Sequence, residues 1–374
     1  MHGCGGQGKV CARLLRPCSQ VQMPHEHPHT VLTATAAATA GPMIIEVTRG
    51  DMVESRHRAD IAIVDAGGKV VRSWGDIEPP VYGRSAIKPL QALPLIESGA
   101  ADRFGVSMAE TALACASHNG EARHVELVTA WLGRIGCSGA DLECGSHAPY
   151  LEASVEALIR AGRKPDATYN NCSGKHTGFL ATARHLGEPT AGYIRYEHPV
   201  QQRILGVLEQ MTGLRLGDAP RGIDGCGIPV IGIPLGNMAL AMARLADPDD
   251  HVPPGRAAAA KRILAAMASE PFLVAGTGRF CTKVMEIVGA KVVLKTGAEG
   301  VYTAALPTVG LGVALKVADG AGRAAEVAMG RVLHELKLLS ADEAKALADA
   351  LTPPIRNRVG RETGRIRPAA AGAT

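Results

Sequence analysis

From Met43 onward the sequence alternates between short apolar runs and longer segments of helical periodicity, with glycine or proline between many of them. Gly67-Gly68 separates two of the apolar runs, which is typical of a hairpin turn. The alternation predicts an α/β fold in which helices flank a mixed sheet. Strands are expected at residues 44–50, 59–74, 229–235 and 291–306, and helices at 87–99, 121–136, 253–268 and 321–336.

The region 43–374 is expected to fold as one compact unit with two lobes, because it contains no internal repeat and no long linker. Residues 1–42 differ, since they hold a His/Pro patch and a Thr/Ala tract without helical or strand periodicity. These features predict that residues 1–42 form a disordered N-terminal extension, and that its histidines belong to a solvated tail rather than to a metal site. The arginine-rich tail from Pro353 predicts a terminal strand or a solvated segment, not a nucleic-acid patch.

Composition narrows the class of protein. Hydrophobic residues make up 46% and charged residues 20% of the 374 residues, which is enough for a packed core. Aromatic residues make up only 3%, which argues against a stacking platform for single-stranded nucleic acid. The net charge of +4 is too small for an electrostatic DNA binder. No run of about 18 apolar residues is present, so no membrane span is expected.

Nine widely spaced cysteines without a C-x-x-C pair indicate neither a disulfide scaffold nor a zinc ribbon. Reduced thiols in the cytoplasm are the simplest interpretation. Secretion is the alternative, because residues 30–41 are small and mildly apolar. That stretch is rich in Thr and Ala and follows histidines and Glu26 where a signal peptide has basic residues, so we favour the cytoplasm.

Ser85 and Lys88 form an S-x-x-K pair at the start of the helix expected over 87–99. The spacing places both side chains on one face of the helix. Pro89 fits the first turn, where a missing N–H costs nothing. The positive end of the helix dipole disfavours an ammonium group, which helps Lys88 to act as a neutral base for Ser85.

Two further fragments follow in the chain: Ser117-His118-Asn119 has the form S-x-N, and Lys295-Thr296-Gly297 is K-T-G at the end of an apolar run. With S-x-x-K, in this order, they match the signature elements of serine β-lactamases and penicillin-binding proteins. The set predicts an acyl hydrolase with a serine nucleophile and lysine bases. Taken alone, K-T-G is better explained as a strand ending in a turn, and the deacylating glutamate of some β-lactamases has no obvious counterpart.

Cys172 and Cys226 lie in polar, glycine-rich segments between apolar elements, where binding sites are often built. Two interpretations stay open: a thiolate activated by Lys175 or His176, or a site for a soft metal. Cys115, Cys137 and Cys144 fit inert buried positions.

Six separated segments together resemble the rhizobial-type L-asparaginases, also called class 3 asparaginases. They are YGRSAIKPLQALPLIESG (82–99), CASHNGE (115–121), NNCSGKHTGFL (170–180), GIDGCGIP (222–229), AGTGRFCT (275–282) and VVLKTGAEGVY (292–302). The resemblance covers residues 43–368 and makes 43–374 an asparaginase domain. It implies a fold similar to that of serine β-lactamases and glutaminases, and hydrolysis of L-asparagine to L-aspartate and ammonia by a homodimer.

The resemblance also assigns the site. Two Ser–Lys tandems correspond to Ser85 with Lys88 and to Ser117 with Lys295, and we favour Ser85 as the nucleophile. A zinc site of two cysteines, a lysine and water is implied, with Cys281 nearby. The zinc ligands correspond to Cys172, Lys175 and Cys226, and the residues expected to contact substrate or support the metal are Arg84, Glu121, His176 and Asp224.

Three alternatives remain. A related Ser–Lys amidohydrolase, glutaminase-like or β-lactamase-like, would act on another amide. A cysteine hydrolase would use Cys172 with His176. A non-enzymatic zinc protein would leave the two Ser–Lys pairs without a role.

Overall fold

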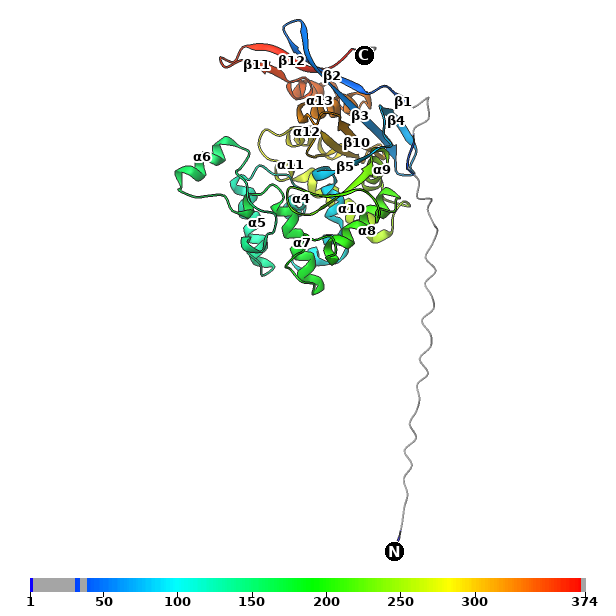
Figure 1. Ribbon diagram of the computed structural model, residues 1–374, viewed down its shortest axis with the longest axis vertical. Coiled ribbons are helices and arrows are strands. Elements are labelled where there is room, and N and C mark those ends of the chain that lie inside the picture. The colour runs from blue at the N-terminus through cyan, green and yellow to red at the C-terminus, as the bar shows by residue number, and fades with distance from the viewer. Residues whose placement is uncertain (3–30, 34–38, 371–374) are drawn as a thin grey trace.

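The computed structural model describes residues 1–2, 31–33 and 39–370, and within these ranges nine strands form one sheet (Figure 1). The strands are β1 (Thr39–Ala40), β2 (Met43–Arg49), β3 (Met52–Asp65), β4 (Val70–Trp74), β8 (Val293–Thr296), β9 (Val301–Leu306), β10 (Leu311–Val317), β11 (Pro354–Arg356) and β12 (Glu362–Pro368). Their order is β11-β12-β2-β3-β10-β9-β8, with β4 beside β3 and β1 beside β4. Only β1 and β4 pair in parallel, so the predicted mixed sheet is confirmed.

A smaller sheet has the order β5-β7-β6, with β5 (Pro80–Tyr82), β6 (Arg221–Ile223) and β7 (Pro229–Pro234). The helices of the first half are η2 (Arg84–Ile87), α1 (Lys88–Gln91), α2 (Leu93–Glu97), α3 (Ala100–Arg103), α4 (Met108–Ala114), α5 (Ala122–Arg134), η3 (Gly139–Asp141), α6 (Glu152–Arg160), η4 (Ala167–Tyr169) and α7 (Ser173–Leu186). Those of the second half are α8 (Pro199–Thr212), α9 (Leu235–Ala246), α10 (Pro254–Ser269), α11 (Pro271–Val274), α12 (Phe280–Val288), η5 (Gly289–Lys291), α13 (Gly322–Glu335), α14 (Ala341–Ala346) and α15 (Ala348–Leu351).

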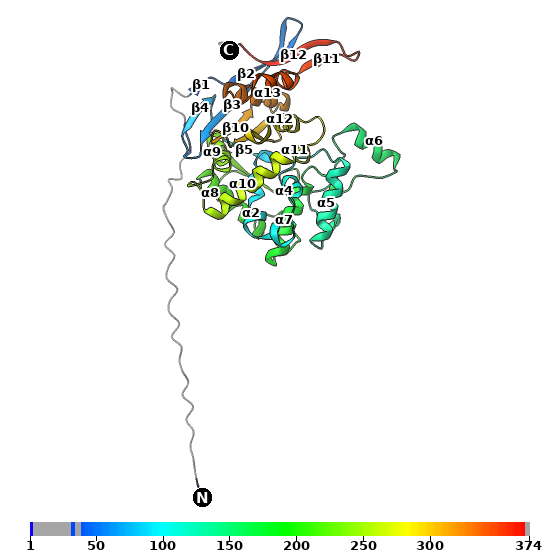
Figure 2. The ribbon, with the colours of Figure 1, turned by 180° about the vertical axis from the view of Figure 1, so that it is seen from behind.

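Helices cover both faces of the large sheet, α9 on one face and α13 on the other (Figure 2). Residues 59–64 of β3 run through the middle of the sheet and are almost all buried, because both faces of this segment are covered. At Gly312 of β10 an added Cβ would lie 2.0 Å from the carbonyl oxygen of Ala239. The backbone of α9 therefore rests directly on β10, and glycine is required there.

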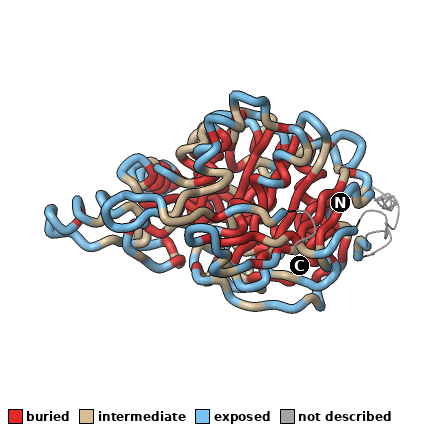
Figure 3. The backbone as a smooth tube through the Cα atoms, turned by 90° about the horizontal axis from the view of Figure 1, so that it is seen from above, coloured by how far each residue is buried: buried red, intermediate tan, exposed pale blue. Residues whose placement is uncertain are grey.

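Beside the sheets, a group of helices packs around α7 and α4. Eleven consecutive residues of α7, from Ser173 to Ala183, are buried, and the helix ends at Gly187 in the left-handed conformation. At Gly174 an added Cβ would lie 2.3 Å from the carbonyl oxygen of Leu113, so α4 and α7 approach closely at that point. Figure 3 shows buried segments running through the middle of the molecule, with α6 in the exposed arm that projects from it in Figure 1.

The expected helices at 121–136, 253–268 and 321–336 are confirmed as α5, α10 and α13. The segment 87–99 was expected as one helix but forms α1 and α2, because Pro94 has no N–H to continue the hydrogen-bond ladder across Ala92. The predicted turn at Gly67-Gly68 joins β3 and β4.

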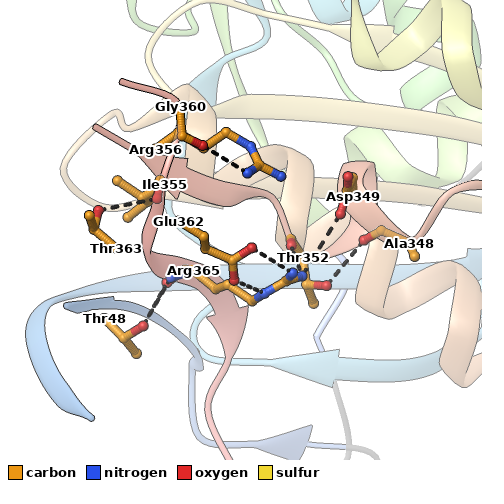
Figure 4. Close-up of polar contacts among 10 residues, drawn as sticks. All are labelled: Thr48, Ala348, Asp349, Thr352, Ile355, Arg356, Gly360, Glu362, Thr363 and Arg365. Atoms are coloured by element: carbon orange, nitrogen blue, oxygen red, sulfur yellow. Dashed lines mark hydrogen bonds and ion pairs between the residues drawn. The ribbon is translucent and has the colours of Figure 1, made fainter. Parts of the chain in front are cut away.

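The arginine-rich tail forms the hairpin of β11 and β12, as one of the two expectations stated (Figure 4). The side chain of Arg365 donates to both carboxylate oxygens of Glu362, at 2.6 and 3.0 Å, and to the carbonyl oxygen of Thr352 at 3.2 Å. Its backbone N–H donates to the hydroxyl of Thr48 on β2 at 3.0 Å. The arginines of this hairpin therefore tie the last strand to the second.

Much of the predicted N-terminal extension, residues 3–30 and 34–38, lies outside the described residues, and His25, His27 and His29 fall there. The described part of the extension contacts the domain. Leu32 donates its backbone N–H to Asn237 Oδ1 at 3.0 Å, and β1 pairs with β4. The six cysteines in the described ranges are all free thiols. Within the same ranges, no helix combines the length and the apolar character that a membrane crossing requires.

Candidate active site

The hydroxyl of Ser117 lies between two buried amines. Lys88 Nζ donates to Ser117 Oγ at 3.0 Å, and Lys295 Nζ donates to the same oxygen at 2.8 Å. Lys88 is 1% exposed, Lys295 is 0% exposed and Ser117 is 6% exposed. The three predicted residues thus form one hydrogen-bonded chain that is shielded from water.

Three elements bring these side chains together. Ser117 follows α4, and its backbone N–H donates to the carbonyl oxygen of Val274 at the end of α11. Lys88 begins α1 and also donates to the carbonyl oxygen of Ala116. Lys295 extends from β8, the strand that the K-T-G fragment predicted. Residues separated by some 200 positions are therefore fixed by backbone contacts rather than by flexible loops.

Burial controls the charge of both lysines. It lowers the pKa of Lys88 and lowers that of Lys295 well below the usual range, because an ammonium group loses its hydration there. The positive charges of Lys88 and Arg279 add to the effect on Lys295. Neutral lysine can accept a proton from a serine hydroxyl, so the site has the bases that serine chemistry needs.

Ser85 lies in η2, one turn before Lys88. The residue is half-buried, and its hydroxyl has no hydrogen-bond partner among the residues described. The backbone N–H of Lys88 donates to the carbonyl oxygen of Ser85, while its Nζ donates to Ser117 Oγ and not to the Ser85 hydroxyl. At Gly297 an added Cβ would lie 3.0 Å from the carbonyl oxygen of Gly83, so the K-T-G fragment packs against the turn that carries Ser85. Ser85 thus keeps an unbonded hydroxyl one turn before Lys88.

Cys172, Lys175 and Cys226 converge at a second buried point next to the first. Lys175 Nζ donates to Cys226 Sγ at 3.1 Å, and the two thiols lie close enough for each to shift the pKa of the other. Cys172 and Lys175 belong to the start of α7, and Cys226 lies in the turn between β6 and β7. Cys172 and Cys226 also act to raise the pKa of Lys88, so the cysteine group lies next to the Ser117 chain.

The charges within this group are balanced. The hydrogen bond from Cys226 outweighs burial and lowers the pKa of Cys172 well below its usual range. Burial acts to lower the pKa of Lys175, but the negative charge on the sulfurs raises it to about 12. The donor chemistry of two thiols and one amine at a common point fits a zinc ion with an open fourth position. No cluster of three or more His, Cys, Asp or Glu side chains with metal-binding geometry occurs in the described part of the chain.

Arg84 and Asp224 form an ion pair that joins the turn before α1 to the β6–β7 turn. Arg84 donates through Nε at 2.9 Å to Asp224 Oδ1, with Nη2 at 2.8 Å from the same oxygen. Arg84 has φ of +48°, an uncommon conformation for a residue with a side chain. Burial acts to raise the pKa of Asp224, but the charges of Lys175 and Arg84 lower it. Asp224 therefore remains ionised beside the cysteine group.

The carboxylate of Glu121 accepts hydrogen bonds from Thr277 and Asn119. Thr277 donates to it through its backbone N–H at 2.8 Å and its hydroxyl at 2.6 Å, and Asn119 Nδ2 donates at 3.1 Å. The bonds from Thr277 outweigh burial and lower the pKa of Glu121. The described structure gives Glu121 the role of holding the 275–279 loop, and contact with a substrate stays a prediction.

The side chains of His176 and Cys281 each contact a tyrosine hydroxyl. His176 Nδ1 and the Tyr193 hydroxyl are 2.7 Å apart, and His176 Nε2 is buried without a partner among the described residues. The His176 ring is bonded to Tyr193 and the Cys172 thiol donates to Asn171 Oδ1, so the imidazole–thiol dyad of a cysteine hydrolase is not formed. Cys281 Sγ lies 2.8 Å from the Tyr302 hydroxyl, and burial raises the pKa of this thiol.

Sequence reasoning missed His118 and His124 as buried supports of the site. His118 Nδ1 accepts from the backbone N–H of Gly120 at 3.1 Å, and Ser173 Oγ lies 2.9 Å from Nε2. The Ser173 hydroxyl donates to the carbonyl oxygen of Thr168, so His118 is the neutral Nε2–H tautomer. Burial lowers its pKa well below the usual range. No spacing rule could have found a stacked histidine pair 4.8 Å apart.

The site, with one serine hydroxyl between two buried lysine amines and a second serine one turn before Lys88, defines the class of Ser–Lys amidohydrolases. A family model described as L-asparaginase II matches residues 45–368. The chain belongs to this family, as the sequence segments predicted. No curated protein matches the sequence.

Several solved structures are similar in part. Mglu, 17% identical with a TM-score of 0.41, matches 76% of this chain and 68% of its own. A β-lactamase from Mycobacterium bovis and a D-alanine carboxypeptidase from Burkholderia cenocepacia are each 14% identical with TM-scores of 0.35. Both match 78% of this chain, covering 95% and 92% of their own. At such identities and TM-scores the function has to be argued from the site.

Proposed function

We propose that this protein hydrolyses L-asparagine to L-aspartate and ammonia. The observation that carries the proposal is the Ser117 hydroxyl between Lys88 and Lys295, with Ser85 one turn before Lys88. Family membership supports asparagine as the substrate. The Ser85 hydroxyl has no hydrogen-bond partner among the described residues, which supports its use as the group that reacts with substrate.

In the proposed reaction Ser85 Oγ bonds to the side-chain amide carbon, and its proton passes to Lys88. Lys88, Ser117 and Lys295 form the path by which this proton reaches the amide nitrogen. The carbon–nitrogen bond breaks and ammonia leaves, so an ester to Ser85 remains. Water then adds to the ester, and its second proton returns to Ser85 through the same path, which releases aspartate.

Ammonia release from L-asparagine by the wild type, Ser85→Ala and Ser117→Ala tests the proposal. The wild type is expected to release ammonia and Ser85→Ala none, while Ser117→Ala loses about 10²- to 10⁴-fold because a proton carrier is missing. Ser154→Ala on the projecting helix α6 is the matched control. Acid quench and peptide mapping of an acyl-enzyme on Ser117 would reverse the roles of the two serines. A wild type that releases ammonia only from glutamine, or opens lactams, would assign the site to another amide.

We further propose that Cys172, Lys175 and Cys226 bind zinc. When bound, the ion would supply a Lewis acid next to the acyl site, and thiolate donation would weaken it. Zinc is therefore expected to raise substrate affinity rather than to generate the nucleophile. Metal analysis should find zinc in the wild type and in Cys137→Ser, which changes a thiol outside the group, but not in Cys172→Ser. Zinc-free protein that loses kcat while KM stays constant would contradict this role.

A homodimer in the cytoplasm completes the proposal. The free state of all six described cysteines supports a reducing compartment. Light scattering is expected to give twice the chain mass of 38.9 kDa. A monomeric mass at working concentration, or recovery of the protein outside the cell with oxidised thiols, would contradict these two assignments separately.

A further inference from the structure

Arg279 has a guanidinium group beside the Ser–Lys site with most of its hydrogen-bonding capacity unused. Its Nη1 donates to Asn119 Oδ1 at 3.0 Å, and no carboxylate lies within ion-pair distance among the described residues. Arg84, the other arginine at the site, is already paired with Asp224. An arginine that is held in place but lacks an anion is suited to bind one.

The orientation of Arg279 is fixed by a buried amide. Asn119 is 2% exposed, and its Nδ2 donates to Glu121 Oε1 and to the carbonyl oxygen of Thr277, both at 3.1 Å. The amide oxygen must therefore face Arg279. At Gly276 an added Cβ would lie 2.6 Å from Asn119 Nδ2, so the loop that carries Arg279 presses directly on this amide.

The guanidinium lies close to the reacting groups. Asn119 is two residues beyond Ser117 in the chain, and the charge of Arg279 helps to lower the pKa of Lys295, after burial and Lys88. Burial raises the pKa of Glu326, the acidic group that Arg279 influences, and thus disfavours its charged form. Arg279 also precedes α12, whose first turn has no acidic residue.

Another side of Arg279 lies near an exposed aromatic ring. Its guanidinium carbon lies 6.0 Å from the ring centroid of Tyr150, a residue that is 59% exposed. Asn171 Nδ2 donates to the Tyr150 hydroxyl at 2.7 Å, and Asn171 adjoins Cys172. Arg279 itself is half-buried, so part of the residue remains exposed to solvent.

We propose that Arg279 binds the α-carboxylate of the amino-acid substrate. The inference rests on the proposed asparaginase function, because a free amino acid with a short side chain brings its α-carboxylate close to the amide that reacts. An arginine fork matches a carboxylate in geometry as well as charge. Arg279 then determines specificity for free amino acids over amides without this group.

The test compares three amides in the wild type, Arg279→Gln and Arg279→Lys. Asparagine and succinamic acid carry the carboxylate, and β-alaninamide lacks it. Arg279→Gln is expected to lower kcat/KM for the first two by about 10- to 150-fold and to leave β-alaninamide unchanged. Arg279→Lys should fall between, because it keeps the charge and loses the fork. Arg331→Gln, which removes a surface charge from α13, is the control.

Equal losses on all three amides would show a structural role for Arg279 and overturn the inference, as would an unchanged kcat/KM for asparagine. A wild type inactive on asparagine would overturn the proposed function instead. Calorimetry with L-aspartate and β-alanine then decides the inference separately. Weaker aspartate binding by Arg279→Gln supports it, while equal binding, or no binding by the wild type, overturns it.

Discussion

Lys295 places an amine inside the protein with no acidic partner, and this has a measurable effect on stability. Its pKa is lowered well below 10.5 by burial, with the charges of Lys88 and Arg279 acting in the same direction and Cys281 and Cys172 against them. Between the folded and unfolded pKa values the unfolded chain holds one more proton, so the free energy of unfolding rises with pH. Above about pH 10.5 the difference disappears.

Lys295→Met is therefore expected to stabilise the protein more at pH 7 than at pH 10, and to abolish activity. Denaturant unfolding of both proteins at the two pH values measures the difference. In the wild type, activity should decline as pH falls through the folded pKa of Lys295, because the protonated amine no longer accepts a proton. Equal stabilisation at both pH values would mean that Lys295 is charged in the folded protein.

Gly297 allows β8 to approach the turn that carries Ser85. In Gly297→Ala the new Cβ would meet the carbonyl oxygen of Gly83 at 3.0 Å and Ala86 at 3.2 Å, both parts of that turn. Activity is expected to fall at least tenfold, because small displacements of reacting groups are costly, while Tm changes little. Steady-state kinetics beside thermal unfolding check this. Full activity in the variant would show that the contact has no role in positioning Ser85.

Sequence spacing predicted Ser85, Lys88, Ser117 and Lys295 as catalytic residues, because local backbone geometry fixes the residues within each motif, and their catalytic roles stay predictions. It paired Ser85 with Lys88, whereas the structure directs both amines to Ser117. Arg279 was missed for two reasons. It lacks a carboxylate partner among the described residues, and it is held by Asn119, which lies 160 residues away in the sequence. Such contacts leave no periodic signal in one sequence.

At the scale of elements, the contact of β10 with α9 should be the least tolerant of change. In Gly312→Ala the Cβ would lie 2.0 Å from the oxygen of Ala239 and 2.2 Å from the nitrogen of Ala243, both backbone atoms of a buried helix. Neither can move without separating the helix from the sheet. A loss of at least about 4 kcal/mol in the free energy of unfolding is expected, or failure to fold. Urea unfolding and soluble yield measure it.

Gly206 in α8 is the matched control for this change. No heavy atom lies within 4 Å of its added Cβ, and its backbone is helical. Gly206→Ala is expected to stabilise the protein by about 0.5–1 kcal/mol, because alanine loses less backbone entropy on folding. Destabilisation of both variants to a similar extent would contradict the packing argument for Gly312.

The elements themselves were largely predictable, because apolar periodicity reports which face of a strand or helix is buried. Pro94 indicates the break between α1 and α2, but the apolar residues around it continue the helical pattern, so one helix was expected. Strand order was not predictable. The pairing of β12 with β2 and of β10 with β3 depends on tertiary packing, which single-sequence patterns do not contain.

For the whole molecule, the boundary of the domain can be tested by truncation. Chains that start at residue 31 keep the Leu32–Asn237 hydrogen bond and the β1–β4 pair, and chains that start at residue 43 lose both. The longer chain is expected to be as stable as the full protein and the shorter one to lose about 1–3 kcal/mol. Thermal unfolding of the two truncated chains compares them. Equal melting temperatures would place the boundary at Met43.

The closure of the sheet by β12 also has a consequence for synthesis. The backbone N–H of Arg365 on β12 donates to the hydroxyl of Thr48 on β2, which lies 317 residues earlier in the chain. β2 is therefore synthesised long before β12 and lacks this partner strand until translation is almost finished. At typical elongation rates that interval is about 15–60 s. During it one edge of β2 is open to pairing with another nascent chain. Expression at a high level, which brings many nascent chains together, should therefore reduce the yield of folded protein. The folded protein itself is expected to be fully stable.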